Sequence, residues 1–140
     1  MRAKDCTRKN EKRGWAVFKD NVTKKKLAGQ RIRKRIRKKI SGTPERPRVL
    51  VTRTNRYLYV QTIDDINGKV LSSACTLEKA FREKHTNLKN MDAAKSLGEV
   101  VADRLKKKKI KTIVFDRGIS PYHGRIKNLA DAMRKGGLVF

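Results

Sequence analysis

The feature that most constrains this chain is a short basic segment between residues 31 and 40. Its sequence is RIRKRIRKKI, with seven lysines and arginines, three isoleucines and no acid. Because like charges repel one another, so much positive charge on one element works against a compact fold unless a polyanion meets it. Nucleic acid is the usual partner of this kind, and an anionic membrane surface comes second.

The positive charge is concentrated in the first third of the chain. Residues 1–48 carry 19 lysines and arginines against 4 acids, whereas residues 49–140 carry 19 against 9, which together give a formal net charge of +25. We therefore expect a basic N-terminal arm over 1–47, with a helix at about 27–41, and a compact domain with a basic surface over 48–140.

Several classes of protein are disfavoured by what the sequence lacks. No stretch approaches the roughly 18 apolar residues of a membrane span, and residues 1–20 have no apolar signal-peptide core. Cys6 and Cys75 are too few and too far apart for a disulfide scaffold, so we expect reduced thiols in a cytosol-like compartment or its organelle equivalent. His85 and His123 lie far from any cysteine pair, so no zinc site is expected, and neither is any cofactor.

The first 26 residues are polar and basic, apart from GWAVF at 14–18. With so few apolar positions, we expect this stretch to become ordered only on a partner. Trp15 and Phe18 are suited to stack on a base or dock on a protein. A small local hydrophobic contact is the alternative.

A helix is predicted to follow, because Leu27, Ile32, Ile36 and Ile40 recur at near-helical spacing. Ser41-Gly42 predicts its end. The apolar stripe is too narrow for a core helix or for a membrane-surface helix. The basic residues around the stripe are candidate phosphate ligands. They are Arg31, Arg33, Lys34, Arg35, Arg37, Lys38 and Lys39.

The rest of the chain predicts a βββαβα order. Strand-like runs at 48–53, 57–64 and 69–76 are joined by short turns, which indicates an antiparallel meander. Residues 77–89 are predicted to form a loop, and the chain from 90 onward a helix to about 107, a buried strand at 111–115 and a last helix. The expected buried helix residues are Met91, Ala94, Leu97, Val101 and Leu105, then Ile126, Leu129, Ala130 and Met133. We predict a mixed sheet with helices on one face, an α+β-like arrangement that leaves the other face for a ligand.

Two further groups of residues suit RNA. Alternation in the second strand places Leu58, Val60 and Thr62 on one face, and the other face is expected to present Asn55, Tyr57, Tyr59 and Gln61 together with Arg53. Aromatic, amide and arginine side chains on a sheet suit RNA bases and phosphates. A purely structural role for the tyrosines is the alternative.

The loop DRGISPYHGR at 116–125 is the second group. It gathers Arg117, Tyr122, His123, Gly124 and Arg125 ahead of a helix N-terminus, where backbone N–H groups favour a phosphate. The alternative is that these side chains form hydrogen bonds that close the loop on itself. The loop can have both roles at once.

Catalysis is not expected. Asp116 and the Asp64-Asp65 pair each follow a strand, as a nuclease carboxylate often does, and the last helix adds Asp131. Two-metal hydrolysis needs several convergent acids, and aspartates at a turn are expected for local reasons. A general DNA-compacting protein is a second alternative.

Motifs spread over residues 31–140 resemble those of the bacterial-type large-subunit ribosomal protein L18 family. They are KKISGTPERPR, NRYLYVQTIDD, ACTLEKAF and FDRGISPYHGRIKNLADA, in the order and spacing of the family. The resemblance implies a mixed α/β fold and a non-catalytic protein that binds 5S ribosomal RNA. It also implies that the protein seats 5S RNA in the central protuberance, beside the large-subunit RNA and other 5S-binding proteins.

The resemblance also implies which residues contact RNA. It adds Arg46 and Arg48 to the RNA-contacting arm, supports the strand-face set from Arg53 to Gln61, and supports the loop set, to which we add Lys127. The family usually has a second glycine where this chain has Ile119.

Overall fold

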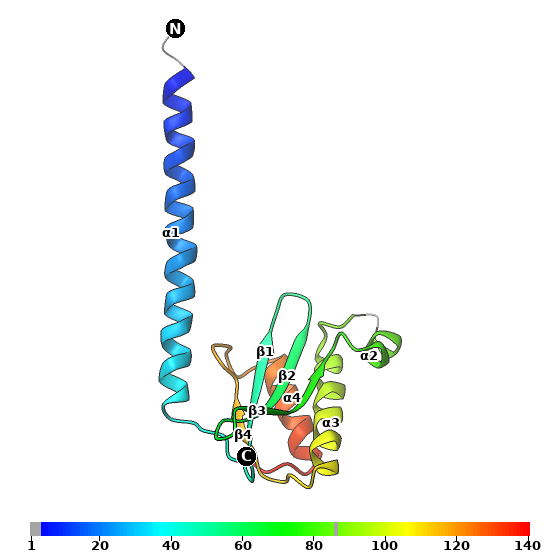
Figure 1. Cartoon of the computed structure of the whole chain (residues 1–140). Coiled ribbons are helices and arrows are strands. Elements are labelled where there is room, and N and C mark those ends of the chain that lie inside the picture. Colours follow the sequence, from blue (N-terminus) through cyan, green and yellow to red (C-terminus); the bar gives the residue numbers. More distant parts are fainter. Residues whose placement is uncertain (1–3, 86) are drawn as a thin grey trace. The chain divides into compact units, whose positions relative to one another are not determined.

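The fold is that of a computed structural model, which describes the backbone of residues 4–85 and 87–140 and side chains from residue 21 onward. The chain forms two compact units, Met1–Arg35 and Ile36–Phe140, and each is described by itself (Figure 1). The second unit thus begins earlier than the predicted boundary at residue 48.

The first unit is part of one long helix, α1 (Lys4–Arg37), of 34 residues. The expectation of a helix confined to about 27–41 is therefore wrong at both ends. Lysine, arginine and alanine have high helix propensity, and a helix satisfies its backbone hydrogen bonds without a core. After Arg37 the N–H groups of Lys39 and Ile40 both donate to the carbonyl of Ile36, which closes the last turn. The side chains of Cys6, Trp15 and Phe18 lie outside the described residues.

The second unit contains a four-stranded mixed sheet. Strands β1 (Arg48–Arg53), β2 (Leu58–Asp64) and β3 (Lys69–Cys75) form the predicted antiparallel meander. The short strand β4 (Val114–Asp116) pairs parallel with β1, so the sheet order is β3-β2-β1-β4. Strand β4 lies later in the sequence than the predicted 111–115. Just before it, Thr112 forms a parallel bridge with Val139 near the C-terminus.

Three helices complete this unit: α2 (Lys79–Lys84), α3 (Met91–Lys107) and α4 (Arg125–Lys135). The prediction of a loop over 77–89 is wrong where α2 forms, because Phe81 is buried and anchors that turn in the core. The buried stripes of α3 and α4 are confirmed except at Met91, which is 56% exposed because it begins α3. Helices α3 and α4 pack against each other on one side of the sheet (Figure 1).

Close contact between α3 and α4 depends on Gly98. A Cβ atom at this position would lie 2.7 Å from the carbonyl oxygen of Leu129 and 2.8 Å from the Cβ of Ala132. We expect Gly98→Ala to lower the free energy of unfolding by about 1–2 kcal/mol. Overpacking costs about 1–3 kcal/mol, which exceeds the helix-propensity gain of about 0.5–1 kcal/mol.

Urea unfolding followed by circular dichroism measures this loss. Glu99→Ala is the matched control, because Glu99 is the next residue of α3 and is exposed. That control should change stability by less than about 0.5 kcal/mol. A Gly98→Ala protein as stable as the wild type would show that the two helices can separate without cost.

Candidate nucleic-acid interface

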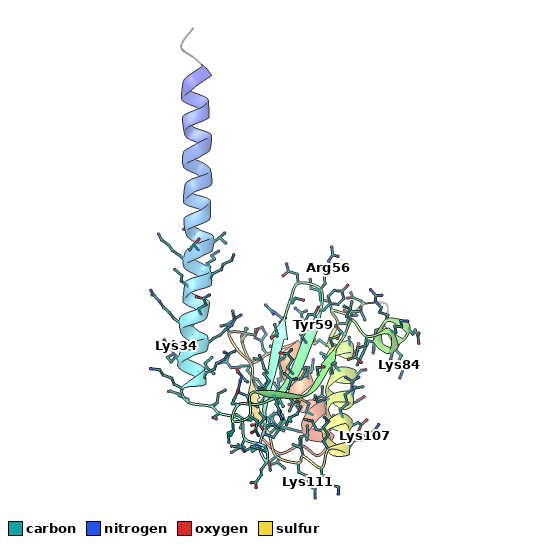
Figure 2. The ribbon with its side chains drawn as sticks, viewed as in Figure 1. Lys34, Arg56, Tyr59, Lys84, Lys107 and Lys111 are labelled. Atoms are coloured by element: carbon teal, nitrogen blue, oxygen red, sulfur yellow. The ribbon has the colours of Figure 1, made fainter. Side chains whose placement is uncertain are left out.

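The basic segment at the end of α1 is fully available to a partner. Arg31, Arg33, Lys34, Arg35 and Arg37 of the helix and Lys38 and Lys39 after it are all exposed. Figure 2 labels Lys34, which extends from the helix. Ile32 is also exposed and Ile36 is half-buried, so the apolar stripe is as narrow as the sequence predicts. No acid occurs in the sequence between Asp20 and Glu45. The segment therefore contains no counterion of its own, although Asp65 lies near enough to feel the charge of Arg37.

Arg48 is a correction to the predicted RNA-binding set. It is 4% exposed and forms a buried ion-pair network with two acids. Its Nε and Nη2 donate to the carboxylate of Asp65 at 2.8 and 2.5 Å, and its Nη1 donates to Asp116 at 3.1 Å. Because both acids are engaged by this one guanidinium, Arg48 is a structural residue with no exposed donor for a phosphate.

The same network fixes the segment that leads into β1. The backbone N–H of Gly42 donates to Asp65 at 2.8 Å, and the N–H of Asp65 donates back to the carbonyl of Gly42. The hydrogen bond from Arg48 is the main cause that lowers the pKa of Asp65, and the same bond raises the pKa of Arg48. The segment from Gly42 to Pro47 is thereby folded onto the sheet, with Gly42 and Pro47 buried.

Arg46 remains a candidate RNA-binding residue. It is exposed, and only its Nε is engaged, in a 3.3 Å hydrogen bond to the carbonyl of Ile113. That bond holds the side chain and leaves both terminal nitrogens free within the part of the chain that the structure describes.

The open sheet face is the side of the sheet that α3 and α4 do not cover. Cross-strand pairing places Tyr59 between Thr52 and Cys75, and Gln61 between Leu50 and Ser73. Leu58, Val60 and Thr62 are buried on the opposite side, so the predicted alternation of β2 is confirmed. Tyr59 is half-buried and Gln61 is exposed, which leaves a ring and an amide for a ligand.

The remaining members of the strand-face set lie elsewhere. Arg53 pairs with Leu58, so it lies on the helix-covered side, and the prediction that it shares a face with Tyr59 is wrong. Asn55 and Tyr57 belong to the β1–β2 hairpin loop, where the hydroxyl and N–H of Thr54 both bond Tyr57. Strand alternation does not apply to these two residues, because β1 ends at Arg53 and β2 begins at Leu58. Arg56, which the sequence analysis overlooked, is exposed near the tip of the hairpin (Figure 2).

The loop at 116–125 is held partly by its own contacts. Asp116 accepts the N–H of Gly118 at 2.8 Å, and the Arg117 guanidinium donates to the carbonyl of Ser120 at 2.6 Å. Gly118 adopts a φ of +59°, whereas Ile119 has no positive φ, so the isoleucine fits this loop without backbone strain. Arg117 remains exposed and keeps donors for a ligand.

Tyr122 of this loop has a structural role. Its hydroxyl accepts a 2.9 Å hydrogen bond from Arg134, and its ring meets Phe115 edge-on at 6.4 Å between centroids. The alternative in which hydrogen bonds close the loop therefore holds for Tyr122, although this residue is still 41% exposed.

The other loop residues line a cavity of about 610 Å³, which we call the Arg125 cavity. Its basic and polar lining consists of Arg53, Asn87, Lys89, Asn90, His123, Gly124 and Arg125, and it includes one acid, Asp92. These residues come from the end of β1, the start of α3 and the start of α4. The structure thus brings Arg53 together with the loop residues rather than with the tyrosines. Lys127 is exposed on the first turn of α4.

Some basic residues belong to the fold. Arg104 of α3 pairs with Glu78 at 2.5 Å and also donates to the carbonyl of Ser73, and Lys108 donates to the carbonyl of Leu71. These bonds cover the free edge of β3, which protects it from pairing with another chain. The hydrogen bond from Arg104 is the main cause that lowers the pKa of Glu78.

The acids that suggested a nuclease have structural partners. Asp64 accepts the N–H groups of Ile66 and Asn67 in the β2–β3 turn, and Asp131 pairs with Arg134 on the same helix. With Asp65 and Asp116 engaged by Arg48, no group of acids among the described side chains, those of residues 21–85 and 87–140, is arranged to hold a metal ion. Nor is any helix in these ranges long and apolar enough to cross a membrane.

The sequence matches the family described as ribosomal L18 of archaea, bacteria, mitochondria and chloroplast over residues 23–140. The chain belongs to the ribosomal L18 family. Among similar proteins are the large ribosomal subunit proteins uL18 of Kosmotoga olearia and Thermotoga petrophila. The first is 55% identical over 106 residues, which cover 76% of this chain and 87% of that protein. The second is 48% identical over 121 residues, which cover 85% of this chain and 99% of that protein.

Membership of the L18 family makes this chain a structural ribosomal protein and not an enzyme. The matched region includes the basic end of α1, the open sheet face and the Arg125 cavity. The first 22 residues lie outside it.

Proposed function

We propose that this L18 protein binds 5S ribosomal RNA and attaches it to the large-subunit ribosomal RNA in the central protuberance. The observation that carries the proposal is the division of cations between fold and surface. Arg48, Arg104 and Lys108 hold the fold, whereas all the lysines and arginines from Arg31 to Lys39 are exposed, in a segment without acids.

The two units suit contacts with more than one RNA segment. Helix α1 has 34 residues and is therefore about 50 Å long at the usual rise per residue. Along its described side chains, the exposed cations from Lys24 to Arg37 are spread over several helical turns. The α/β unit adds a second surface of different chemistry, with Tyr59 and Gln61 for stacking and hydrogen bonds.

In this mechanism the arm attracts the RNA electrostatically, and the sheet recognises the shape of the RNA. Arginine forks pair with phosphates and release counterions, which makes the binding salt-dependent but not sequence-specific. The open sheet face and the loop at 116–125 then orient the protein on a particular RNA fold. Other 5S-binding ribosomal proteins are the expected protein neighbours.

A chemical footprint of the full chain on 5S RNA tests the proposal. We expect protection of a defined set of 5S nucleotides, and binding that survives an equal concentration of duplex DNA at physiological salt. Displacement by the DNA would favour a general DNA-compacting role instead. RNA cleavage with multiple turnover in Mg²⁺ would contradict both roles.

The open sheet face makes a separate prediction. We expect Tyr59→Ala to weaken 5S RNA binding by about 1–3 kcal/mol, the usual worth of one stacked base. The slope of log affinity against log salt should stay the same, because stacking releases no counterions. Titrations at several salt concentrations measure both quantities. Tyr59→Phe is the matched control and should bind like the wild type, and an unchanged affinity for Tyr59→Ala would remove this face from the interface.

A further inference from the structure

The Arg125 cavity has an excess of positive charge without internal partners. Arg53, Lys89 and Arg125 line it, and within the described residues their cationic side-chain groups form no hydrogen bond or ion pair. The backbone N–H of Lys89 donates to the side chain of Asn87 at 3.1 Å. The only acid in the lining is Asp92, which already contacts Lys95 at 3.4 Å. The cavity is therefore prepared for an anion.

One atom points to this conclusion independently of the helix ends. Nη1 of Arg125 is buried and has no hydrogen-bond partner within the described residues. A buried charged donor is normally satisfied, so an unsatisfied one marks a place where a partner is missing. Figure 2 shows the unit with its side chains, and Arg125 begins α4 directly after Gly124.

The helix starts add backbone donors. Asn90 precedes α3 and Gly124 precedes α4, and neither provides a side-chain cap for its helix. The free N–H groups at such ends and the positive end of the helix dipole favour a phosphate. Gly124 adopts a φ of +55°, a conformation in which a side chain would be strained.

The cavity is too large and too varied for a phosphate alone. Its volume of about 610 Å³ lies in the usual range for small organic ligands. Besides the cations it presents the imidazole of His123, the amides of Asn87 and Asn90 and the thioether of Met91. Ring faces and amides are the groups with which proteins hold unstacked bases.

We propose that the Arg125 cavity receives a single unstacked nucleotide of the bound RNA. Its phosphate is held by Arg125 and the N-terminus of α4, and its base lies among His123, Asn87 and Asn90. The proposal rests on the proposed RNA-binding function and names the form of RNA that this site takes. The cavity and the open sheet face are separate surfaces, since Arg53 and Tyr59 lie on opposite sides of the sheet.

Amide NMR of the full-length chain tests the proposal. The four nucleoside 5′-monophosphates and inorganic phosphate are titrated separately. We expect at least one nucleotide to give saturable shifts at Asn90, Gly124 and Arg125, with an affinity about tenfold above that of phosphate, because of base contacts. Equal affinities would reduce the cavity to an anion site, and an absence of saturable shifts would also overturn the proposal.

Substitutions make the test specific. Arg125→Gln should weaken nucleotide binding about tenfold, the usual effect of losing a charged hydrogen bond. Arg53→Gln is a second variant that keeps the test valid if Arg125→Gln fails to fold, since Arg53 is exposed at the end of β1. Lys107→Gln removes the same charge outside the cavity and should leave binding unchanged. Equal binding by the cavity variants and the wild type would contradict the assignment.

Binding of 5S RNA by the wild type is measured in parallel, which separates the two proposals. Nucleotide binding in the cavity without 5S binding would support the cavity and overturn only the choice of 5S RNA. Tight 5S binding with no nucleotide shifts would overturn the cavity and leave the proposed function standing.

Discussion

Replacing Arg48 with methionine should lower the free energy of unfolding by about 3–5 kcal/mol, the usual cost of removing one partner from a buried ion pair. The side chain of Arg48 is 5% exposed, and that of Asp116 is 4% exposed. Without the guanidinium, both Asp116 and Asp65 lose their cation, and the Asp116 carboxylate stays buried. Urea unfolding at neutral pH, followed by circular dichroism, measures the loss.

The pH dependence of this loss follows from the pKa of Asp65, which Arg48 lowers in the folded protein. A lowered folded pKa contributes stability above the unfolded pKa of about 3.9, and that contribution disappears as pH falls through the folded value. We therefore expect the difference between wild type and Arg48→Met to be largest near neutral pH and to shrink in acid. A difference independent of pH would show that packing, and not charge, causes the loss.

Arg46→Met is the matched control for this experiment. Arg46 lies two residues earlier and is exposed, and its side chain makes one hydrogen bond within the described residues, to the carbonyl of Ile113. Its loss should cost about 1 kcal/mol or less. If both substitutions destabilise the fold equally, the buried network around Arg48 is not what holds the segment 38–47 on the sheet.

The contrast between these two arginines shows what a sequence can predict. Alternation in β2 and the helical spacing of Leu97, Val101 and Leu105 are local patterns, and the structure confirms both. The role of Arg48 depends on acids 17 and 68 residues away. Nothing near Arg48 in the sequence distinguishes it from an exposed arginine such as Arg46, which remains a candidate RNA ligand.

Other differences have the same origin. Residues 77–89 contain only four apolar residues, Leu77, Ala80, Phe81 and Leu88. That pattern is too short to predict the helix that burial of Phe81 stabilises. The cavity around Arg125 is assembled from three segments that only the tertiary fold brings together. The composition of the arm correctly indicated charge and the lack of a core. It did not indicate that residues with high helix propensity would continue one helix back to Lys4.

The second large effect is expected in the arm. Replacing Arg33, Arg35 and Arg37 with alanine should flatten the slope of log affinity against log salt by about 2–3, because three phosphate contacts release that many fewer counterions. Such a change in slope corresponds to a roughly hundredfold weaker affinity for 5S RNA at physiological salt. Binding titrations with the full chain between low and high salt measure both values.

The effect of net charge on binding must be distinguished from the effect of direct contact with RNA phosphates. Lys84, Lys107 and Lys111 are exposed cations of the α/β unit and are labelled in Figure 2. Their triple alanine variant carries the same net charge as the arm variant. If the arm contacts RNA phosphates directly, only the arm variant shows the flatter slope, since a released counterion requires a phosphate that is actually neutralised. Equal slopes in the two variants would mean that the arm acts only through the field of the whole protein.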